Sequence, residues 1–509
     1  MKRGPVGSQL SPIRTAGLMF AALLVPATTL ALLASPATAV DTPAPSIKLV
    51  SGSDTAEIHL YRQGRYEIHL PLFMASDGGA FELWAQRPTY DDPVQLRQVI
   101  RDGNGVVVSN HQIIGVPEPR LSAGLPGFLQ MELTHRNGTS LKDLVRPFCP
   151  TAWRSERMDD TGPTVPTYPA DCWASPFTRG GVWGIHQGWA TPVYPTLGRT
   201  LRVDPGTYRL TVSIAEPYRS TFDIAPADAQ IKVKAVVSSG AGSTHRSEAL
   251  ATESSMPTPT QGQLTAAPDV VPPDSALPDN EALPAWGIRV ENREKSGRAF
   301  LNFGATAWNA GPGALVVEGF RDPSATQMQA FQYFYEDDAV VGKVSAGELE
   351  YDARDGHDHW HFRDFAAYSL LDATKTKIVD SGKEAFCLAP TDPIDLTVDG
   401  AEWRPWLADL GTACGEAGSL WIREVLAAGW GDTYTQYRPG QSFEITDLSN
   451  GTYYIRVLAN PDGVLTEGST ANNEALRKIK IHGKPGKRWV EVPMYGLVDS
   501  EGSSCGPFC

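Results

Sequence analysis

The sequence predicts an all-β protein with two antiparallel β-sandwich-like domains joined by a Pro/Ser/Thr-rich linker. The chain of 509 residues is longer than one hydrophobic core usually organises, so two domains are expected. Its 40 prolines and 48 glycines are typical of turn-rich sheets rather than of helical bundles. Apolar and polar residues also alternate in short runs, as in residues 207–214, and this is the spacing of strands.

The first 39 residues are predicted to be a signal peptide. Three basic residues come before or beside an uncharged apolar run over about residues 16–33, and residues 37–39 form a small-residue cleavage site, Ala-Thr-Ala. An N-terminal membrane anchor is the alternative, although Pro26 interrupts the apolar run. We therefore expect a secreted, extracellular protein.

The rest of the chain divides by composition. Residues 40–237 are predicted to form an N-terminal β-rich domain. Residues 238–282 turn into Ser, Thr, Ala and Pro, which cannot bury enough surface to fold, so we expect an extended linker. Residues 283–485 form the second β-rich domain, and residues 486–509 a C-terminal tail. Strand candidates in the second domain are Arg298–Trp308, Phe365–Leu371 and Thr452–Ala459.

The two halves share a faint internal similarity. Residues 206–212 resemble residues 451–457, and residues 128–137 resemble residues 300–309. Duplication would explain this, but we favour the alternative that two unrelated sandwiches use the same strand and turn sequences.

Charge and cysteine content limit the function. The formal net charge is −14, and loss of a signal with three basic and no acidic residues would make it −17. Nucleic acid is therefore an unfavourable partner, whereas cationic substrates would be attracted. In an oxidising compartment all six cysteines can pair, and the other connectivities that six cysteines allow stay open. The pairs of near neighbours are Cys149 with Cys172, Cys387 with Cys414, and Cys505 with Cys509.

Three of the ten histidines lie in one short alternating motif, at His357, His359 and His361. On a strand, residues at i, i+2 and i+4 project from the same face, so three imidazoles can meet at one point. Such a set suits Cu(II) or Zn(II), and the spacing alone does not choose between them. The alternative is a polar surface strand with incidental histidines.

Residues 357–372 are similar to the copper-binding motif of lysyl oxidases, in which a histidine triplet precedes a strand ending Tyr-x-Leu-Leu-Asp. Further segments follow in the family's order. Residues 382–388 resemble the segment with the cofactor lysine, residues 429–434 the one with the cofactor tyrosine, and residues 450–473 the terminal strands. The chain is identified as a secreted bacterial member of the lysyl oxidase family, over about residues 283–482.

The resemblance implies a copper-dependent amine oxidase with a cofactor made from its own side chains. Copper and dioxygen would oxidise Tyr434 to a dopaquinone, and Lys383 would add to the ring to give lysine tyrosylquinone. Ordinary side chains have no electrophilic carbonyl that captures an amine and stores two electrons, which is why such a group is needed. Primary amines, as lysine side chains, polyamines or small amines, would then react with dioxygen to give aldehyde, ammonia and hydrogen peroxide.

Other residues complete the expected site. A carboxylate with a raised pKa should remove the substrate's α-proton, and Asp432 is the first candidate, followed by Asp358 and Asp364. The resemblance also implies calcium ligands in an acidic loop before paired asparagines, with an Asn-rich turn as the alternative. The residues proposed for calcium are Glu467, Asn472 and Asn473.

The chain departs from vertebrate members of the family in two ways. It has Tyr351-Asp-Ala-Arg354 in place of Trp-x-Trp-His before the triplet, and it has fewer cysteines. Two other functions stay open: a non-catalytic copper-binding extracellular β-sandwich protein, and a zinc hydrolase with an activated water. Neither needs the pair Lys383 and Tyr434. The N-terminal domain would recognise a cell-envelope or matrix polymer, or space the enzyme from one.

Overall fold

The computed structural model describes residues 44–60, 66–68, 70–138, 140–193, 203–226, 228–237, 269–270, 272–336, 339–353, 358–363, 365–380, 385–405, 414–435 and 442–496. All of them lie in one compact unit, Ala44–Cys509. Strands dominate this part of the chain, and its only helical segments are α1 (Tyr218–Thr221) and the 3₁₀ turn η2 (Asp274–Ala276). The all-β prediction is confirmed. None of the helices in the described ranges has the length and apolar character of a membrane span.

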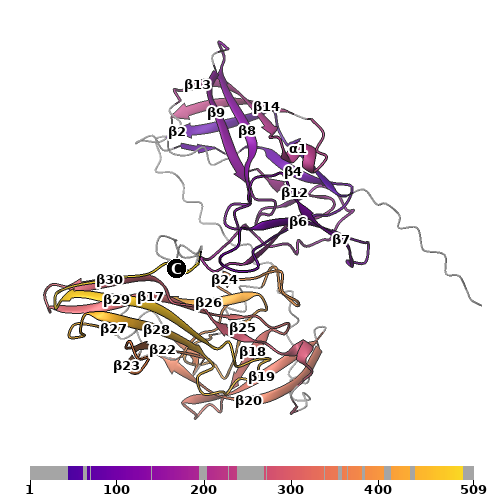
Figure 1. Ribbon diagram of the computed structural model, residues 1–509. Helices are drawn as coiled ribbons and strands as arrows, with labels where there is room; N and C mark the ends of the chain where they lie inside the picture. Colours follow the sequence, from indigo (N-terminus) through magenta and orange to yellow (C-terminus); the bar gives the residue numbers. More distant parts are fainter. Residues whose placement is uncertain are drawn as a thin grey trace, which may run out of the picture. The chain divides into compact units, whose positions relative to one another are not determined.

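The N-terminal region, up to residue 237, is built from short strands (Figure 1). They are β1 (Ser46–Ser51), β2 (Thr55–Leu60), β3 (Tyr66–Ile68), β4 (Leu72–Asp77), β5 (Phe81–Gln86), β6 (Gln95–Arg101), β7 (Val107–Ile113), β8 (Leu125–His135), β9 (Ser140–Phe148), β10 (Glu156–Arg157), β11 (Gly180–Ile185), β12 (Trp189–Pro192), β13 (Gly206–Ile214) and β14 (Ala229–Val237). Their sheets have the orders β1-β4-β12-β10, β11-β5-β6-β7 and β3-β2-β14-β13-β8-β9. The pairings are antiparallel except for β14 with β2.

The C-terminal region begins with β15 and holds the longer strands. They are β15 (Asn280–Ala282), β16 (Trp286–Arg293), β17 (Arg298–Asn309), β18 (Leu315–Phe320), β19 (Gln327–Glu336), β20 (Ala339–Asp352), β21 (His359–Phe362), β22 (Ala366–Leu371), β23 (Lys377–Asp380), β24 (Asp392–Pro393), β25 (Trp421–Leu426), β26 (Trp430–Thr435), β27 (Phe443–Glu444), β28 (Gly451–Ala459), β29 (Glu474–Lys484) and β30 (Lys487–Glu491). The three strand candidates of this region correspond to β17, β22 and β28.

Three antiparallel sheets organise the described part of the C-terminal region. Their orders are β15-β17-β26-β24, with β16 and β27 also on β17, then β21-β20-β19-β18-β25, and β23-β22-β28-β29-β30. Alternation explains the core, because β28 buries Tyr453, Ile455, Val457 and Ala459 at every second position. The sheet of β22, β28 and β29 thus packs its apolar face against the strands that carry the site residues.

β13 and β28 both begin with Gly-Thr-Tyr, and in both the tyrosine hydroxyl bonds to the backbone carbonyl four residues earlier, as in a tyrosine corner. The Tyr208 hydroxyl donates to the Asp204 carbonyl at 2.6 Å, and the Tyr453 hydroxyl to the Ser449 carbonyl at 2.7 Å. The other similar pair of segments is not equivalent in space. β8 pairs directly with β13, whereas β17 pairs with β15, β16, β26 and β27, and β28 pairs with β22 and β29. This difference favours two independent sandwiches over a duplication.

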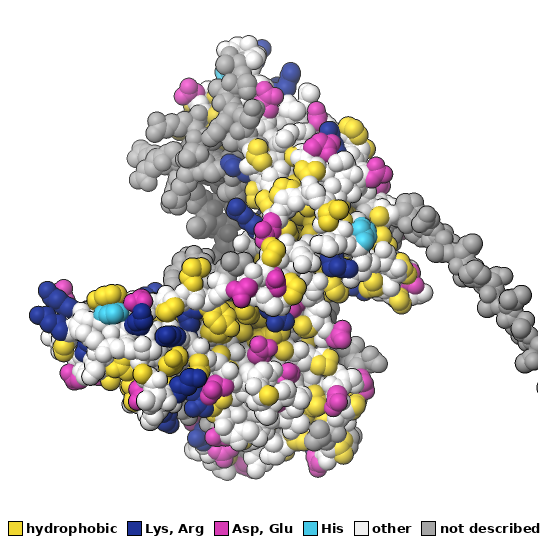
Figure 2. All heavy atoms as spheres, in the orientation of Figure 1, with side chains coloured by type: hydrophobic (Ala, Val, Ile, Leu, Met, Phe, Trp, Pro, Cys, Tyr) yellow, Lys and Arg dark blue, Asp and Glu magenta, His cyan; other side chains and the backbone are white. Residues whose placement is uncertain are grey.

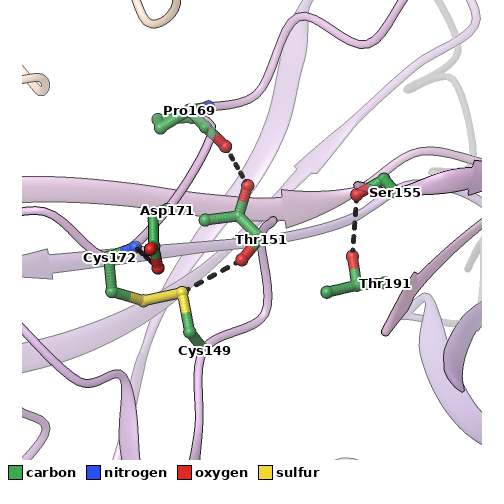
Figure 3. The surroundings of a disulfide bond; sticks show 7 residues. All are labelled: Cys149, Thr151, Ser155, Pro169, Asp171, Cys172 and Thr191. Atoms are coloured by element: carbon green, nitrogen blue, oxygen red, sulfur yellow. Dashed lines mark hydrogen bonds between the residues drawn. A yellow bond between two sulfur atoms is a disulfide. The ribbon is translucent and has the colours of Figure 1, made fainter. Parts of the chain in front are cut away.

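Two of the three predicted disulfides are confirmed. Cys149 bonds to Cys172 and Cys387 bonds to Cys414. The predicted pair Cys505–Cys509 lies outside the described residues. Figure 3 shows that the Cys149–Cys172 bond sits beside Thr151, whose carbonyl oxygen lies 3.1 Å from Cys149 Sγ. The Thr151 hydroxyl donates to the carbonyl of Pro169, which ties the two ends of this disulfide loop together.

The fold extends into both segments that flank the second predicted domain. Residues 274–282, which composition assigned to the linker, contain η2 and β15, and β15 pairs with β17. Leu277 and Asn280 are buried there, so this stretch is held by packing that a local composition does not reveal. At the other end, β30 continues the last sheet into the predicted tail. The domain boundaries themselves stay a prediction.

The net negative charge is not spread evenly over the surface. Figure 2 shows Lys and Arg side chains gathered over the end of β29 and β30. The turn between these strands carries Lys484 and Lys487.

Candidate functional site

The described part of the histidine motif is a strand. In β21, His359 lies opposite Asp352 of β20 and His361 lies opposite Glu350. The rings of His359 and His361 face the same side, with centroids 4.6 Å apart. Trp360 between them is buried, with its ring against Tyr351 at 5.6 Å. Two imidazoles thus lie together as the alternating spacing predicts, and His357 lies outside the described residues.

A carboxylate accompanies the buried imidazole. His361 is 1% exposed, and its Nδ1 lies 3.6 Å from an oxygen of Asp352, which is also buried. A carboxylate at the second ring nitrogen orients a ligating histidine and raises its basicity. The donor chemistry therefore fits a copper or zinc ion at the other nitrogen. No group of three or more His, Cys, Asp or Glu suited to a metal occurs within the described residues, which exclude His357.

Asp358 and Asp364 are the other two candidates for the catalytic base. Asp358 has a left-handed backbone, φ 52°, and its carboxylate accepts a hydrogen bond from the Tyr351 hydroxyl at 2.6 Å. That bond turns the carboxylate toward Tyr351, which is also the neighbour of Trp360. Asp364 lies outside the described residues.

Phe386 connects the histidine strand to the candidate cofactor tyrosine. Its backbone exchanges two hydrogen bonds with Phe362, at 2.7 and 2.9 Å, directly after His361. Its ring meets the ring of Tyr434 edge-on, with centroids 4.5 Å apart. Lys383, three residues before Phe386 in the sequence, lies outside the described residues. The structure therefore brings the end of the lysine segment, the histidine strand and Tyr434 together.

Tyr434 is held by the backbone of Cys387. Its hydroxyl donates to the Cys387 carbonyl at 2.7 Å and accepts from the Cys387 N–H at 3.1 Å. Burial, followed by the charges of Asp432 and Glu424, raises the pKa of the Tyr434 phenol well above its usual value. The phenol is therefore neutral at pH 7 in the absence of a metal.

Asp432 lies on the same face of β26 as Tyr434. The two residues are opposite Ala307 and Ala305 of β17, and Asp432 is 3% exposed. The negative charge of Asp432 also raises the pKa of Tyr368 and of Glu424. Asp432 is thus a buried acid next to the phenol, as the sequence predicts, and its catalytic role stays a prediction.

Glu424 is a site residue that the sequence did not indicate. It is fully buried on β25, and its Oε2 accepts a hydrogen bond from the Leu388 N–H at 3.0 Å, one residue beyond Cys387. Burial raises the pKa of this carboxyl well above its usual value, and the Asp432 charge adds to the shift. The one available signal was an acidic residue directly before the apolar run Val425-Leu426-Ala427-Ala428. Asp352 was missed for a similar reason, since only its pairing with His359 brings it to the site.

The three residues proposed for calcium also lie together. The Glu467 carboxylate accepts amide N–H groups of Asn473 at 2.7 Å and Asn280 at 3.0 Å. Asn472 Nδ2 donates to Asp279 at 3.0 Å, which adds a second carboxylate. Asp279 and Asn280 lie in the segment that composition assigned to the linker. Their separation of nearly two hundred residues from Glu467 explains why the sequence did not connect them.

Amide oxygens at this loop fit a cation. The Oδ1 atoms of Asn280, Asn472 and Asn473 are buried, and no hydrogen-bond donor within the described residues reaches them. A buried oxygen without a partner costs about 1–3 kcal/mol. Carboxylate and amide oxygens are the ligands that calcium prefers, so an ion here would satisfy atoms that the protein leaves unsatisfied.

Comparison with known proteins finds similarity to one family over part of the C-terminal region. Residues 343–491 match the family model described as lysyl oxidase. Lysyl oxidase homolog 3B of Danio rerio is 30% identical over 146 residues, 28% of this chain and 16% of the relative. Protein-lysine 6-oxidase of Sus scrofa is 30% identical over 129 residues, 25% of this chain and 45% of the relative. The chain spans less than half the length of either relative.

The buried Glu424 carboxyl predicts a distinctive pH dependence of stability. The unfolded chain gives up this proton near the ordinary pKa of about 4.3, whereas the folded protein keeps it to higher pH. The native state then binds more protons than the unfolded state, so the contribution of Glu424 to stability falls as pH rises. Glu424→Gln should therefore gain stability relative to the wild type as the pH rises above about 4.3, measured by urea unfolding of copper-free protein.

Glu416→Gln is the matched control, because it is the same substitution at an exposed glutamate, where a change of side chain should affect stability little. Equal pH slopes for Glu424→Gln and the wild type would show that the carboxyl is ionised in the folded protein.

Proposed function

We propose, from the match of residues 343–491 to the lysyl oxidase family model, that this chain is a secreted copper-dependent oxidase of primary amines. The observation that carries the proposal is the contact of Phe386 with both Phe362, beside His361, and the ring of Tyr434. It supports a site in which the histidine, lysine and tyrosine motifs act together. Neither a copper-storage protein nor a zinc hydrolase needs that arrangement.

His357, His359 and His361 are the proposed copper ligands, with Asp352 orienting His361. Copper, when bound, would supply the redox chemistry that couples dioxygen to oxidation of the Tyr434 ring. Lys383 and Tyr434 are the proposed precursors of lysine tyrosylquinone. Cys387 holds the Tyr434 oxygen in place, and the edge of Phe386 keeps water from one face of the ring.

The proposed reaction takes one primary amine, one dioxygen and one water to one aldehyde, one ammonia and one hydrogen peroxide. Asp432 would accept the α-proton, because it is the acid on the Tyr434 face of β26. Burial raises the pKa of Glu424, which is hydrogen-bonded to Leu388, so Asp432 rather than Glu424 is the proposed proton acceptor. The buried acids favour an ammonium substrate, such as a lysine side chain, a polyamine or a small amine.

A calcium ion is proposed in the loop of Glu467, Asn472 and Asn473, with Asp279 and Asn280 as further donors. This site ties the start of the C-terminal region to the hairpin between β28 and β29, since Asn280 begins β15. Its proposed role is structural, because the carboxylates and amides there bind one another rather than the residues around Tyr434.

Tyr434→Phe tests the catalytic proposal. The change keeps the ring beside Phe386 and removes the hydroxyl that must be oxidised, so copper should bind at wild-type stoichiometry. The variant should lack a visible absorption band, fail to react with phenylhydrazine and release no amine-dependent peroxide. Tyr453→Phe is the control, because it loses a hydroxyl bonded to a carbonyl at the same distance, 2.7 Å, outside the site. It should lose about 1 kcal/mol of stability and keep its colour. Peroxide release from Tyr434→Phe at the wild-type rate would refute the quinone mechanism.

Removal of one carboxylate tests the calcium proposal. Calcium should stabilise the wild type against thermal unfolding, by about 3 kcal/mol at a hundredfold excess over its dissociation constant. Glu467→Gln should abolish that gain, whereas Asp462→Asn, an exposed carboxylate on the same loop, should keep it. Differential scanning calorimetry with calcium or magnesium measures the effect. An unchanged calcium response in Glu467→Gln would place any ion elsewhere.

A further inference from the structure

A short bridging segment, residues 391–396, is hydrogen-bonded on both sides. On one side it pairs with the start of β26, with Asp392 opposite Gly431 and Pro393 opposite Trp430. On the other side it meets β11 of the N-terminal region, where Arg179 N–H donates to the Ile394 carbonyl at 2.6 Å and Leu396 N–H to the Gly180 carbonyl at 2.9 Å. Both regions lie in the same compact unit. The bridging segment therefore connects a sheet of the N-terminal region to the strand that carries Asp432 and Tyr434.

Side chains of the N-terminal region fix the bridging segment in place. The hydroxyl of Thr178, fully buried, donates to the Pro393 carbonyl at 2.6 Å. The guanidinium of Arg179 lies 3.3 Å from Asp395, whose other oxygen accepts hydrogen bonds from Thr397. Gly180 has no side chain at the point of closest approach, where a Cβ atom would overlap Asp395 Oδ1. These contacts hold the segment so closely that a methyl group on residue 180 does not fit.

Apolar packing supports the same connection. Phe177 is fully buried in a cluster with Leu283, Trp286, Trp308 and Ile394, so it packs on residues of the C-terminal region. Trp308 in this cluster lies opposite Gly431 of β26. Burial of a phenylalanine side chain contributes about 1.5–3 kcal/mol, so separation of the two regions would be costly.

A second contact reaches the same strand by another route. The ring of Trp403 stacks on Tyr168 with centroids 5.6 Å apart and interplanar angle 11°, and Arg101 covers it at 5.3 Å. Tyr168 and Arg101 both bond to the buried carboxylate of Glu82. The backbone carbonyl of Glu402, the residue before Trp403, accepts a hydrogen bond from the indole N–H of Trp430 at 2.6 Å. Both contacts thus end at the first residues of β26.

Further hydrogen bonds connect the bridging segment to β26 close to the site residues. The Thr433 N–H donates to Thr391 Oγ1 at 2.8 Å, and Thr391 N–H donates to the Gly431 carbonyl at 2.9 Å. Thr433 lies between Asp432 and Tyr434. A shift of the bridging segment would therefore move both site residues, and displacement of a reacting group by about 1 Å can cost about a hundredfold in rate.

We propose that the N-terminal region is a clamp that positions Tyr434, acting through the bridging segment, rather than a separate spacer module. Thr178, Arg179 and Gly180 are positioning residues in this proposal, because none of them touches Tyr434. The role of Tyr434 in this proposal depends on the proposed function. The connection between the N-terminal region and β26 depends only on the contacts described above.

The test uses the full chain and the variant Gly180→Ala, whose methyl group must displace the Asp395 carboxylate. Gly103→Ala is the matched control, because it is the same substitution in the turn between β6 and β7 of the same sheet, with open space around the new Cβ. Hydrogen exchange by mass spectrometry should show amides of residues 429–435 exchanging about tenfold faster in Gly180→Ala, with β28 unchanged. Copper stoichiometry should be unaffected, while the quinone band should form at least about tenfold more slowly.

Thr178→Val is the second variant if Gly180→Ala does not fold, since it keeps the side-chain volume and removes the two hydrogen bonds of the Thr178 hydroxyl, one to the Pro393 carbonyl and one from the Ser175 N–H. Faster exchange confined to residues 391–396, with residues 429–435 as in the wild type, would overturn the clamp. If the wild type forms the quinone, an unchanged rate of quinone formation in the variant would also overturn the clamp. If the wild type forms no quinone but exchange at residues 429–435 still responds, the clamp is supported and the proposed chemistry fails.

Discussion

Two hydrogen bonds between the Tyr434 hydroxyl and the backbone of Cys387 constrain everything around the site. They require the segment after Lys383 to lie against β26, and the Phe362–Phe386 backbone pair then requires β21 to lie beside that segment. The Cys387–Cys414 disulfide anchors the same segment, and Cys414 in turn accepts the Trp360 N–H. One short stretch of backbone therefore sets the distance between the histidine strand and the tyrosine.

The site concentrates acidic groups where burial is costly. Asp392, Glu424 and Asp432 are all nearly inaccessible to solvent, and burial raises the pKa of both Asp392 and Glu424. A fold selected only for stability would replace such groups with apolar side chains. The place of Asp432 on the Tyr434 face of β26 is explained by the proposed chemistry, which needs a proton acceptor there.

Local patterns predicted the strands and the shared face of His359 and His361, because both depend on spacing along the chain, whereas Lys383 and Tyr434 were indicated only by the family resemblance. Alternation gave β17, β22 and β28, and the His359–His361 spacing gave a shared strand face. Long-range pairing was not predictable in this way. Asp279 meets the Glu467 loop, Glu424 meets Leu388, and β11 meets the bridging segment, all between segments far apart in sequence. The linker prediction had the same weakness, since composition could not show that β15 pairs with β17.

The most direct measurement of the central claim is mass spectrometry of a peptide digest of copper-loaded protein. We predict that the peptides containing Lys383 and Tyr434 are recovered as one crosslinked species, with the mass of the two peptides plus the oxygen and minus the hydrogens of quinone formation. Digestion of copper-free protein should give the two peptides separately. Recovery of unmodified Lys383 and Tyr434 peptides from protein with stoichiometric copper and full dioxygen exposure would contradict the account and leave a copper-binding β protein without the quinone.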